Sequence, residues 1–251
     1  MVRFFLVNAF IAFYTILMCM WSALLALFTK DGGRRVHFWA AVPWAKAILW
    51  VSGVRVIREG GEGLNWEVPR IYMANHQSAF DIFALLAGLP VDFKFILKQE
   101  LMKIPILGPA MRRAGYISID RGDPRRAILS INRAAERIKQ GASVLIFPEG
   151  TRSKDGRLQV FKKGGFHLAS KAGVEIVPIV IFNSINIVPK GSMRINRGEI
   201  TLKVCNPVPV NAGRKRDQEK LMACVREVML QAMGEEAGED PGSSSSGGGG
   251  C

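Results

Sequence analysis

The sequence predicts an α/β protein: a mostly parallel mixed sheet flanked by helices, with an N-terminal apolar, membrane-associated helix or helical hairpin. Two observations predict this class. From Arg55 onward, short apolar runs alternate with segments of helical periodicity, which is typical of a layered α/β domain. Before them, residues 4–28 contain no charged side chain, and an uncharged apolar run longer than about 18 residues is a candidate membrane helix.

The chain accordingly divides into three parts. Residues 1–54 are expected to form the membrane-associated helices, and residues 55–233 a single soluble domain. Residues 234–251 are expected to be a disordered tail, because they are rich in glycine, serine and acidic residues. The tail ends in GSSSSGGGGC, which is typical of an appended linker with a terminal thiol.

The flanks of the apolar run predict its orientation. Arg3 precedes it, and Lys30, Arg34 and Arg35 follow it. Positive charges are retained on the cytoplasmic side, so the following domain is expected on the cytoplasmic face of a membrane. Residues 36–54 hold three tryptophans, Lys46 and an internal Pro43, which favours an interfacial helix over a second full span.

Short apolar runs and helical patterns place the elements of the soluble domain. The expected strands are Val54–Arg58, Arg70–Ala74, Phe93–Leu97, Tyr116–Asp120, Ser143–Phe147 and Ile176–Phe182, followed by a hairpin of Ser192–Asn196 and Glu199–Cys205 turned at Arg197-Gly198. The expected helices are Ala79–Ala87, Pro124–Lys139, Gly165–Ala172 and Asp217–Met233. Alternation of this kind favours a parallel sheet with an antiparallel edge.

The charge balance predicts an anionic partner. The chain has 34 Lys and Arg against 21 Asp and Glu, a net charge of +13. An anionic membrane or a phosphorylated substrate fits this excess. Nucleic acid is not expected, since the basic residues are scattered and no nucleic-acid motif is present. The four cysteines lack zinc-ligand spacing, so no zinc site is expected from them, and a reducing cytoplasm is the simpler setting.

The segment Asn75-His76-Gln77-Ser78-Ala79-Phe80-Asp81 directly follows an expected strand. Histidine is the natural general base near neutral pH, and a carboxylate on its second ring nitrogen would orient it. Asp81 can reach His76 only if the chain turns before it becomes helical, because five helical positions separate two side chains by about 140°. The alternative is a helix cap, since Ser78 and Asp81 form an S-x-x-D pattern.

The segment Phe147-Pro148-Glu149-Gly150-Thr151-Arg152-Ser153 also follows an expected strand. An acid, a glycine, two hydroxyls and an arginine in one turn suit a phosphate or polyol ligand. Arg152 can bind phosphate through two N–H groups, and Gly150 allows close backbone approach. The alternative is a polar loop in which Glu149 and Arg152 form a weak surface ion pair.

Lys98 and Arg121 each lie where an expected strand ends, within the pattern Lys98-x2-Leu101-x6-Gly108-x12-Arg121. Two cations at neighbouring strand ends could bind one anion at the carboxyl edge of the sheet. The alternative is two ordinary exposed charges.

Together these segments, with Val177-Pro178-Ile179 after them, resemble the glycerolipid acyltransferase family that includes the 1-acyl-glycerol-3-phosphate acyltransferases. The resemblance covers about residues 71–178 in the family's order. It implies an enzyme that esterifies the sn-2 hydroxyl of lysophosphatidic acid, using acyl-CoA or acyl-carrier protein as co-substrate and no metal or other cofactor. Residues 55–233 would then be the acyltransferase domain.

The resemblance also implies a role for each motif residue. His76 would be the general base and Asp81 its orienting carboxylate. Glu149, Gly150, Thr151 and Arg152 would bind the glycerol-phosphate part of the acceptor. Lys98 and Arg121 match the phosphate-binding cations of the family.

The expected mechanism is direct transfer, in which the acceptor hydroxyl attacks the thioester while His76 removes its proton. Four alternatives stay open from the sequence. The acceptor could be glycerol 3-phosphate, another lysophospholipid or a lyso-aminolipid. The chain could also be a lipid-binding protein without activity. Acyl-chain length, the identity of the donor and the spanning or dipping of the first helix are not set by the motifs.

Overall fold

A computed structural model of the protein describes residues 1–29, 31, 33–119, 124–210 and 215–234. Its strands are β1 (Val54–Glu59), β2 (Ile71–Ala74), β3 (Phe93–Lys98), β4 (Ile117–Ile119), β5 (Ser143–Ile146), β6 (Ile176–Phe182) and β7 (Gly198–Val204). Its helices are α1 (Val2–Phe28), α2 (Arg34–Val36), the π-helix η1 (His37–Ala41), α3 (Val42–Ser52), α4 (Phe80–Gly88), the 3₁₀ helix η2 (Gln99–Lys103), α5 (Leu107–Arg113), α6 (Pro124–Lys139), α7 (Lys163–Ala172), α8 (Ser184–Ile187) and α9 (Lys215–Met233).

The strands form one mixed sheet in the order β1-β7-β6-β2-β5-β3-β4. The five strands from β6 to β4 are parallel, while β7 runs antiparallel to β6 and parallel to β1. The predicted fold class is therefore confirmed. Because parallel strands end at the same edge, the residues that follow β2, β3 and β5 meet at one side of the sheet.

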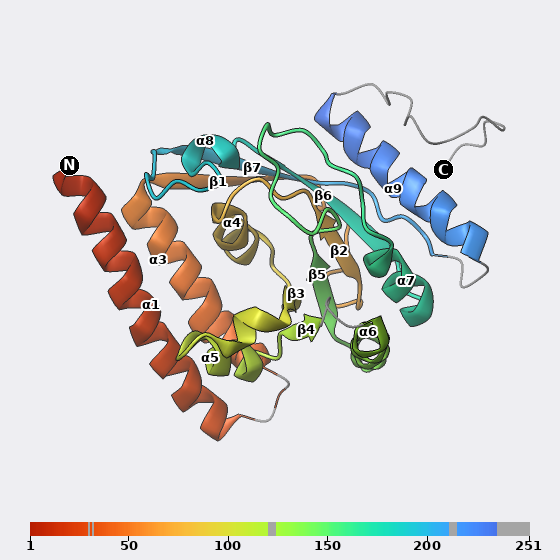
Figure 1. Ribbon diagram of the computed structural model, residues 1–251, viewed down its shortest axis with the longest axis horizontal. Helices are drawn as coiled ribbons and strands as arrows, with labels where there is room; N and C mark the ends of the chain where they lie inside the picture. Colours follow the sequence, from red (N-terminus) through yellow and green to blue (C-terminus); the bar gives the residue numbers. More distant parts are fainter. Residues whose placement is uncertain (30, 32, 120–123, 211–214, 235–251) are drawn as a thin grey trace.

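Helices cover both faces of the sheet (Figure 1). Successive residues of β2 point to opposite faces: Tyr72 and Ala74 pack with α3 and α4, whereas Ile71 and Met73 pack with α6, α7 and α9. All four side chains are buried. A parallel strand covered on both faces reads as a continuous apolar run, which is why Ile71–Ala74 lacks a polar alternation.

The expected hairpin is wrong in its first strand. Residues 192–197 have no strand structure, and the N–H of Asn196 bonds instead to the carbonyl of Ile187 at the end of α8. The second strand, β7, pairs with β1 and β6, which are distant in sequence. The local turn signal at Arg197-Gly198 predicted a local partner, but β7 buries Ile200 and Leu202 by inserting between two other strands.

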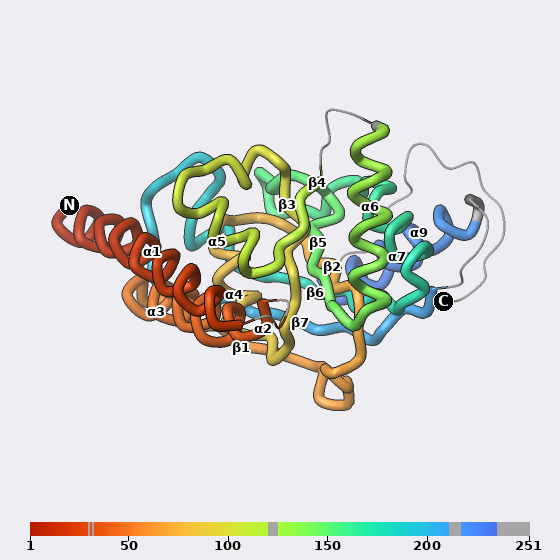
Figure 2. Tube along the Cα trace, turned by 90° about the horizontal axis from the view of Figure 1, so that it is seen from below, coloured from red at the N-terminus to blue at the C-terminus, as the bar shows by residue number. Residues whose placement is uncertain are grey.

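The N-terminal helices pack along the soluble domain (Figures 1 and 2). Helix α1 contacts α5, η1 and α3. At its start, Arg3 donates to the carbonyls of Ser52 (2.7 Å) and Ile195 (3.0 Å). Near its end, Leu25 and Ala26 pack in the cluster that contains Ala114. Both ends of α1 are therefore attached to the domain.

Residues 34–52 are helical, as expected, but contain a π-turn. The N–H of Val42 bonds to the carbonyl of His37, five residues earlier. The next residue is Pro43, which has no N–H to continue the ordinary ladder, and a π-turn accommodates such an interruption. The residues of the expected tail beyond 234 lie outside the described part of the chain.

Candidate active site at the carboxyl edge of the sheet

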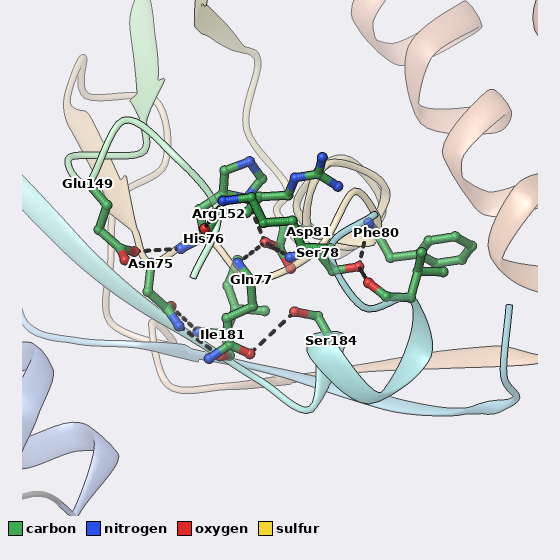
Figure 3. A network of polar contacts seen from close by, with 12 residues as sticks. Asn75, His76, Gln77, Ser78, Phe80, Asp81, Glu149, Arg152, Ile181 and Ser184 are labelled. Atoms are coloured by element: carbon green, nitrogen blue, oxygen red, sulfur yellow. Dashed lines mark hydrogen bonds and ion pairs between the residues drawn. The ribbon is translucent and has the colours of Figure 1, made fainter. Parts of the chain in front are cut away.

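His76 and Asp81 lie together just beyond β2 (Figure 3). Residues 75–78 are irregular, and α4 begins at Phe80. This turn brings His76 Nδ1 to 2.7 Å from Asp81 Oδ2. A carboxylate accepts at this distance, so Nδ1 carries the proton and Nε2 is left to accept one. The pair has the geometry that an oriented general base requires.

Asp81 also caps the helix. The same oxygen, Oδ2, accepts the backbone N–H groups of Gln77 (2.7 Å) and Ser78 (2.9 Å), and Asp81 is fully buried. Ser78 Oγ accepts the N–H of Phe80 and donates to the carbonyl of Val188. The capping and orienting interpretations are thus compatible, because one carboxylate oxygen serves both sets of donors.

The ring of His76 is held on one side by an aromatic neighbour. It stacks on Phe147 with centroids 3.9 Å apart and planes at 14°. The side chain of His76 is 16% exposed. One edge of the imidazole is therefore accessible while its plane and tautomer are fixed.

Glu149 holds the backbone of His76. Its Oε1 accepts the N–H of His76 at 2.7 Å, and its Oε2 accepts the N–H of Gln159 at 3.1 Å. Burial raises the pKa of the Glu149 carboxyl, and these two N–H donors oppose that rise. Glu149 is buried, so a surface ion pair with Arg152 is excluded. Its predicted contact with glycerol phosphate stays a prediction.

The two motif segments are joined by further backbone bonds. The carbonyl of His76 accepts the N–H of Ser153 at 2.7 Å. Gln77 Nε2 donates to the carbonyl of Gly156 at 2.9 Å. Both backbone groups of His76 are therefore bonded to the loop that follows β5, so this loop sets where the imidazole stands.

Gly150 adopts φ of +72°, which favours glycine, and a Cβ there would stand 3.0 Å from the Lys162 side chain. Thr151 Oγ1 and the carbonyl of Arg152 accept bonds from Lys190 Nζ at 3.3 and 2.8 Å. Figure 3 draws Arg152 beside His76. Lys162 and Lys190 add positive charge to the loop.

Lys98 is exposed at the end of β3, on the edge of the sheet that carries His76 and Glu149. Arg121 lies outside the described residues, so the expected convergence of these two cations stays a prediction. Sequence reasoning missed Lys162 and Lys190, and it gave no role to Asn75, whose side chain exchanges two bonds with the backbone of Ile181. Asn75 stands next to His76 and could have been found; the lysines carry no local signal.

An apolar cavity of about 240 Å³ lies between the N-terminal helices and the edge of the sheet. Met18, Ala40, Trp44, Phe95, Leu107 and Tyr116 are among its lining residues. Phe95 also faces Phe147, with centroids 6.3 Å apart, and Phe147 stacks on His76. A row of aromatic rings therefore leads from this cavity to the imidazole.

The chain belongs to the acyltransferase family, whose family model, described as Acyltransferase, matches residues 42–182. This range includes the described motif residues from His76 to Arg152, and the resemblance drawn from the motifs is confirmed.

Among its relatives, it is 42% identical over 177 residues to a chloroplastic 1-acyl-sn-glycerol-3-phosphate acyltransferase of Arabidopsis thaliana, covering 70% of this chain and 49% of that protein. It is 35% identical over 184 residues to 1-acyl-sn-glycerol-3-phosphate acyltransferase alpha of Ovis aries, covering 73% of this chain and 64% of that protein. The chain thus spans about half the length of the plant relative.

The fold is also that of a solved structure. The crystal structure of PlsC, the 1-acyl-sn-glycerophosphate acyltransferase of Thermotoga maritima, matches with a TM-score of 0.76 and 27% identity. The match covers 93% of this chain and 92% of that one. Because the match leaves out only a small part of this chain, it extends over N-terminal helices as well as the sheet.

Proposed function

We propose that the protein transfers a fatty acyl group from acyl-CoA or acyl-carrier protein to the sn-2 hydroxyl of 1-acyl-glycerol 3-phosphate, which gives phosphatidic acid for phospholipid biosynthesis. The observation that carries this proposal is the His76–Asp81 pair, 2.7 Å apart, at the end of an aromatic row that leads to an apolar cavity. A general base beside a site for an acyl chain suits acyl transfer to a hydroxyl.

In the proposed reaction, the acceptor hydroxyl attacks the thioester carbonyl. His76 Nε2 takes the hydroxyl proton, while Asp81 stabilises the imidazolium through Nδ1. The tetrahedral oxyanion then collapses, the C–S bond breaks, and the thiolate takes the proton from His76. No acyl-enzyme, metal or other cofactor takes part.

We assign the acceptor phosphate to the cations around the loop after β5. Arg152 can bind it through two N–H groups, with Lys98 and Arg121 as the further predicted ligands. Gly150 and Thr151 are assigned to the glycerol part. Glu149 acts mainly by holding His76, because both of its oxygens are bonded to backbone N–H groups.

We further propose that α1 lies in one leaflet rather than across the bilayer. By length and composition α1 could cross a membrane. However, both of its ends are bonded to or packed on the same domain. A helix of 27 residues is about 40 Å long, so spanning would require these contacts to break. The acyltransferase domain would sit at the cytoplasmic face.

A product assay tests the proposed function. Purified protein in mixed micelles receives 1-oleoyl lysophosphatidic acid with either oleoyl-CoA or oleoyl-acyl-carrier protein, and phosphatidic acid is quantified. Product with at least one donor is the expected result. Product only from glycerol 3-phosphate, another lysophospholipid or a lyso-aminolipid would change the acceptor, and no product from any of them would leave a lipid-binding role.

A further inference from the structure

A second pocket lies on the other side of the sheet edge from the apolar cavity. It has a volume of about 380 Å³ and is formed by β4 and α6 with the start of η2. Its polar lining consists of Gln99, Ser118, Arg126, Ser130, Arg133 and Arg137. We call it the arginine pocket.

The arginines of this pocket form a stripe along α6. Arg126, Ser130, Arg133 and Arg137 are spaced i, i+4, i+7 and i+11, which places them on one face of a helix. The opposite face packs Ile131, Ala134, Ala135 and Ile138 into the core. The arginines are therefore not required for the packing of α6.

None of the described lining residues of the pocket is acidic. Arg137 is held by a bond to the carbonyl of Gly115 at 2.7 Å. Within the described part of the chain, Arg133 makes neither a hydrogen bond nor an ion pair, and Glu136 of the same helix is bonded to Lys139 instead. Like charges on neighbouring turns are unfavourable unless an anion joins them. Guanidinium groups are suited to phosphate oxygens.

The phosphate of the acceptor is already assigned to cations at the carboxyl edge of the sheet, whereas the arginine pocket is formed by β4, α6 and the start of η2. β4 is three strands from β2, the strand that ends at His76, which corresponds to about 14 Å. In lysophosphatidic acid only the glycerol backbone separates the reacting hydroxyl from the phosphate. An acyl-CoA, in contrast, carries its thioester at the end of a long pantetheine arm whose other end is a phosphorylated nucleotide.

The surroundings of the pocket also suit a water-soluble group. In Figure 1, α6 lies on the opposite side of the sheet from α1. Ile117 and Leu129 give the pocket an apolar wall beside its polar groups, which matches a base next to phosphates. A hollow of this size fits a nucleotide better than the broad surface of a carrier protein.

We propose that the arginine pocket binds the phosphorylated nucleotide of an acyl-CoA donor, with Arg133 as a phosphate ligand. The proposal rests on the proposed acyl transfer and names its donor. In this assignment the apolar cavity takes an acyl chain, and the arginine pocket takes the nucleotide of the donor.

The test measures binding of adenosine 3′,5′-bisphosphate, which lacks both the arm and the thioester, to the full chain by calorimetry. The variants are Arg133→Ala and, as a matched loss of charge on the same helix outside the pocket, Lys139→Ala. We expect Arg133→Ala to weaken nucleotide binding roughly tenfold or more. The KM for acyl-CoA should rise by a similar factor while the KM for lysophosphatidic acid stays as in the wild type. Lys139→Ala should change neither.

Three outcomes would overturn the assignment. They are no nucleotide binding by the wild type, a change confined to the KM for lysophosphatidic acid, or an effect of Arg133→Ala seen only with acyl-carrier protein. Binding does not depend on turnover, so the two proposals can fail separately. Phosphatidic acid formation without nucleotide binding would reject the pocket alone, and nucleotide binding without any acyl transfer would reject the reaction alone.

Discussion

At the scale of single residues, the position of the imidazole depends on a neighbouring loop as much as on its own segment. Asp81 holds the ring through Nδ1, whereas Glu149 and Ser153 hold the two backbone groups of His76. The first contact is local in sequence and could be predicted from the spacing of five residues. The others depend on how two loops from different strands meet, which the motif pattern does not reveal.

Replacing Glu149 by glutamine tests this positioning. An amide has one acceptor oxygen, so its NH₂ group would face one of the two N–H donors that the carboxylate now accepts. We expect the free energy of unfolding to fall by about 1–3 kcal/mol and kcat to fall, measured by thermal melts and by turnover at saturating substrates. An unchanged kcat would show that the two bonds of Glu149 do not control the imidazole.

At the scale of elements, the loop after β5 depends on one backbone conformation. Gly150 has φ of +72° and is covered by Lys162, whereas Gly164, in α7, has nothing near its missing Cβ. Gly150→Ala should lower the free energy of unfolding by about 1–2 kcal/mol and reduce the rate of acyl transfer. Gly164→Ala should raise the free energy of unfolding by about 0.5–1 kcal/mol, because residue 164 lies in a helix. Equal effects of both substitutions on melting temperature would contradict this account.

The π-turn carries a buried histidine that makes stability depend on pH. His37 is fully buried, its Nδ1 is 3.6 Å from Asp92 Oδ1, and Lys94 Nζ is bonded to Asp92 at 2.6 Å. Burial lowers the pKa of His37 to about 4, so the ring is neutral near pH 7 and makes no ion pair.

The unfolded chain, with a pKa of about 6.5 at this residue, takes up the proton first as the pH falls. Stability should therefore be lost between pH 6.5 and pH 4, by about 3 kcal/mol in total for this group. Other groups titrate in the same range, so the measurement is the difference in unfolding free energy between wild type and His37→Phe at each pH. A difference that does not change across this window would contradict the assignment.

At the scale of the whole molecule, the sequence pattern predicts the layers of helices and sheet. It does not predict which strands pair when they are far apart in the chain. The alternation of apolar runs and helices predicted the parallel block and its carboxyl-edge site. The insertion of β7 between β1 and β6 depends on strands that are not its neighbours in a tight turn, so a turn signal at Arg197-Gly198 could not reveal it. The cavity beneath α1 likewise needs the packing of α1, α5 and β3 to exist.

The outer face of α1 is expected to bind membranes. Phe13 is 69% exposed on this helix, and Val160 is 72% exposed on a loop of the domain. Phe13→Glu should weaken co-sedimentation with phosphatidylcholine–phosphatidylglycerol vesicles about tenfold or more, since burial of a phenylalanine contributes about 2 kcal/mol. Val160→Glu should have little effect. An equal loss in both variants would contradict a membrane surface centred on α1.

The most direct test of the central claim is the rate of phosphatidic acid formation by wild type and His76→Ala in mixed micelles. The account predicts that the wild type makes phosphatidic acid and that the substitution lowers kcat about 10²-fold or more, while the folded state, checked by circular dichroism, is retained. Undiminished turnover by a folded His76→Ala protein would contradict the role of His76 as general base, even if the product were phosphatidic acid.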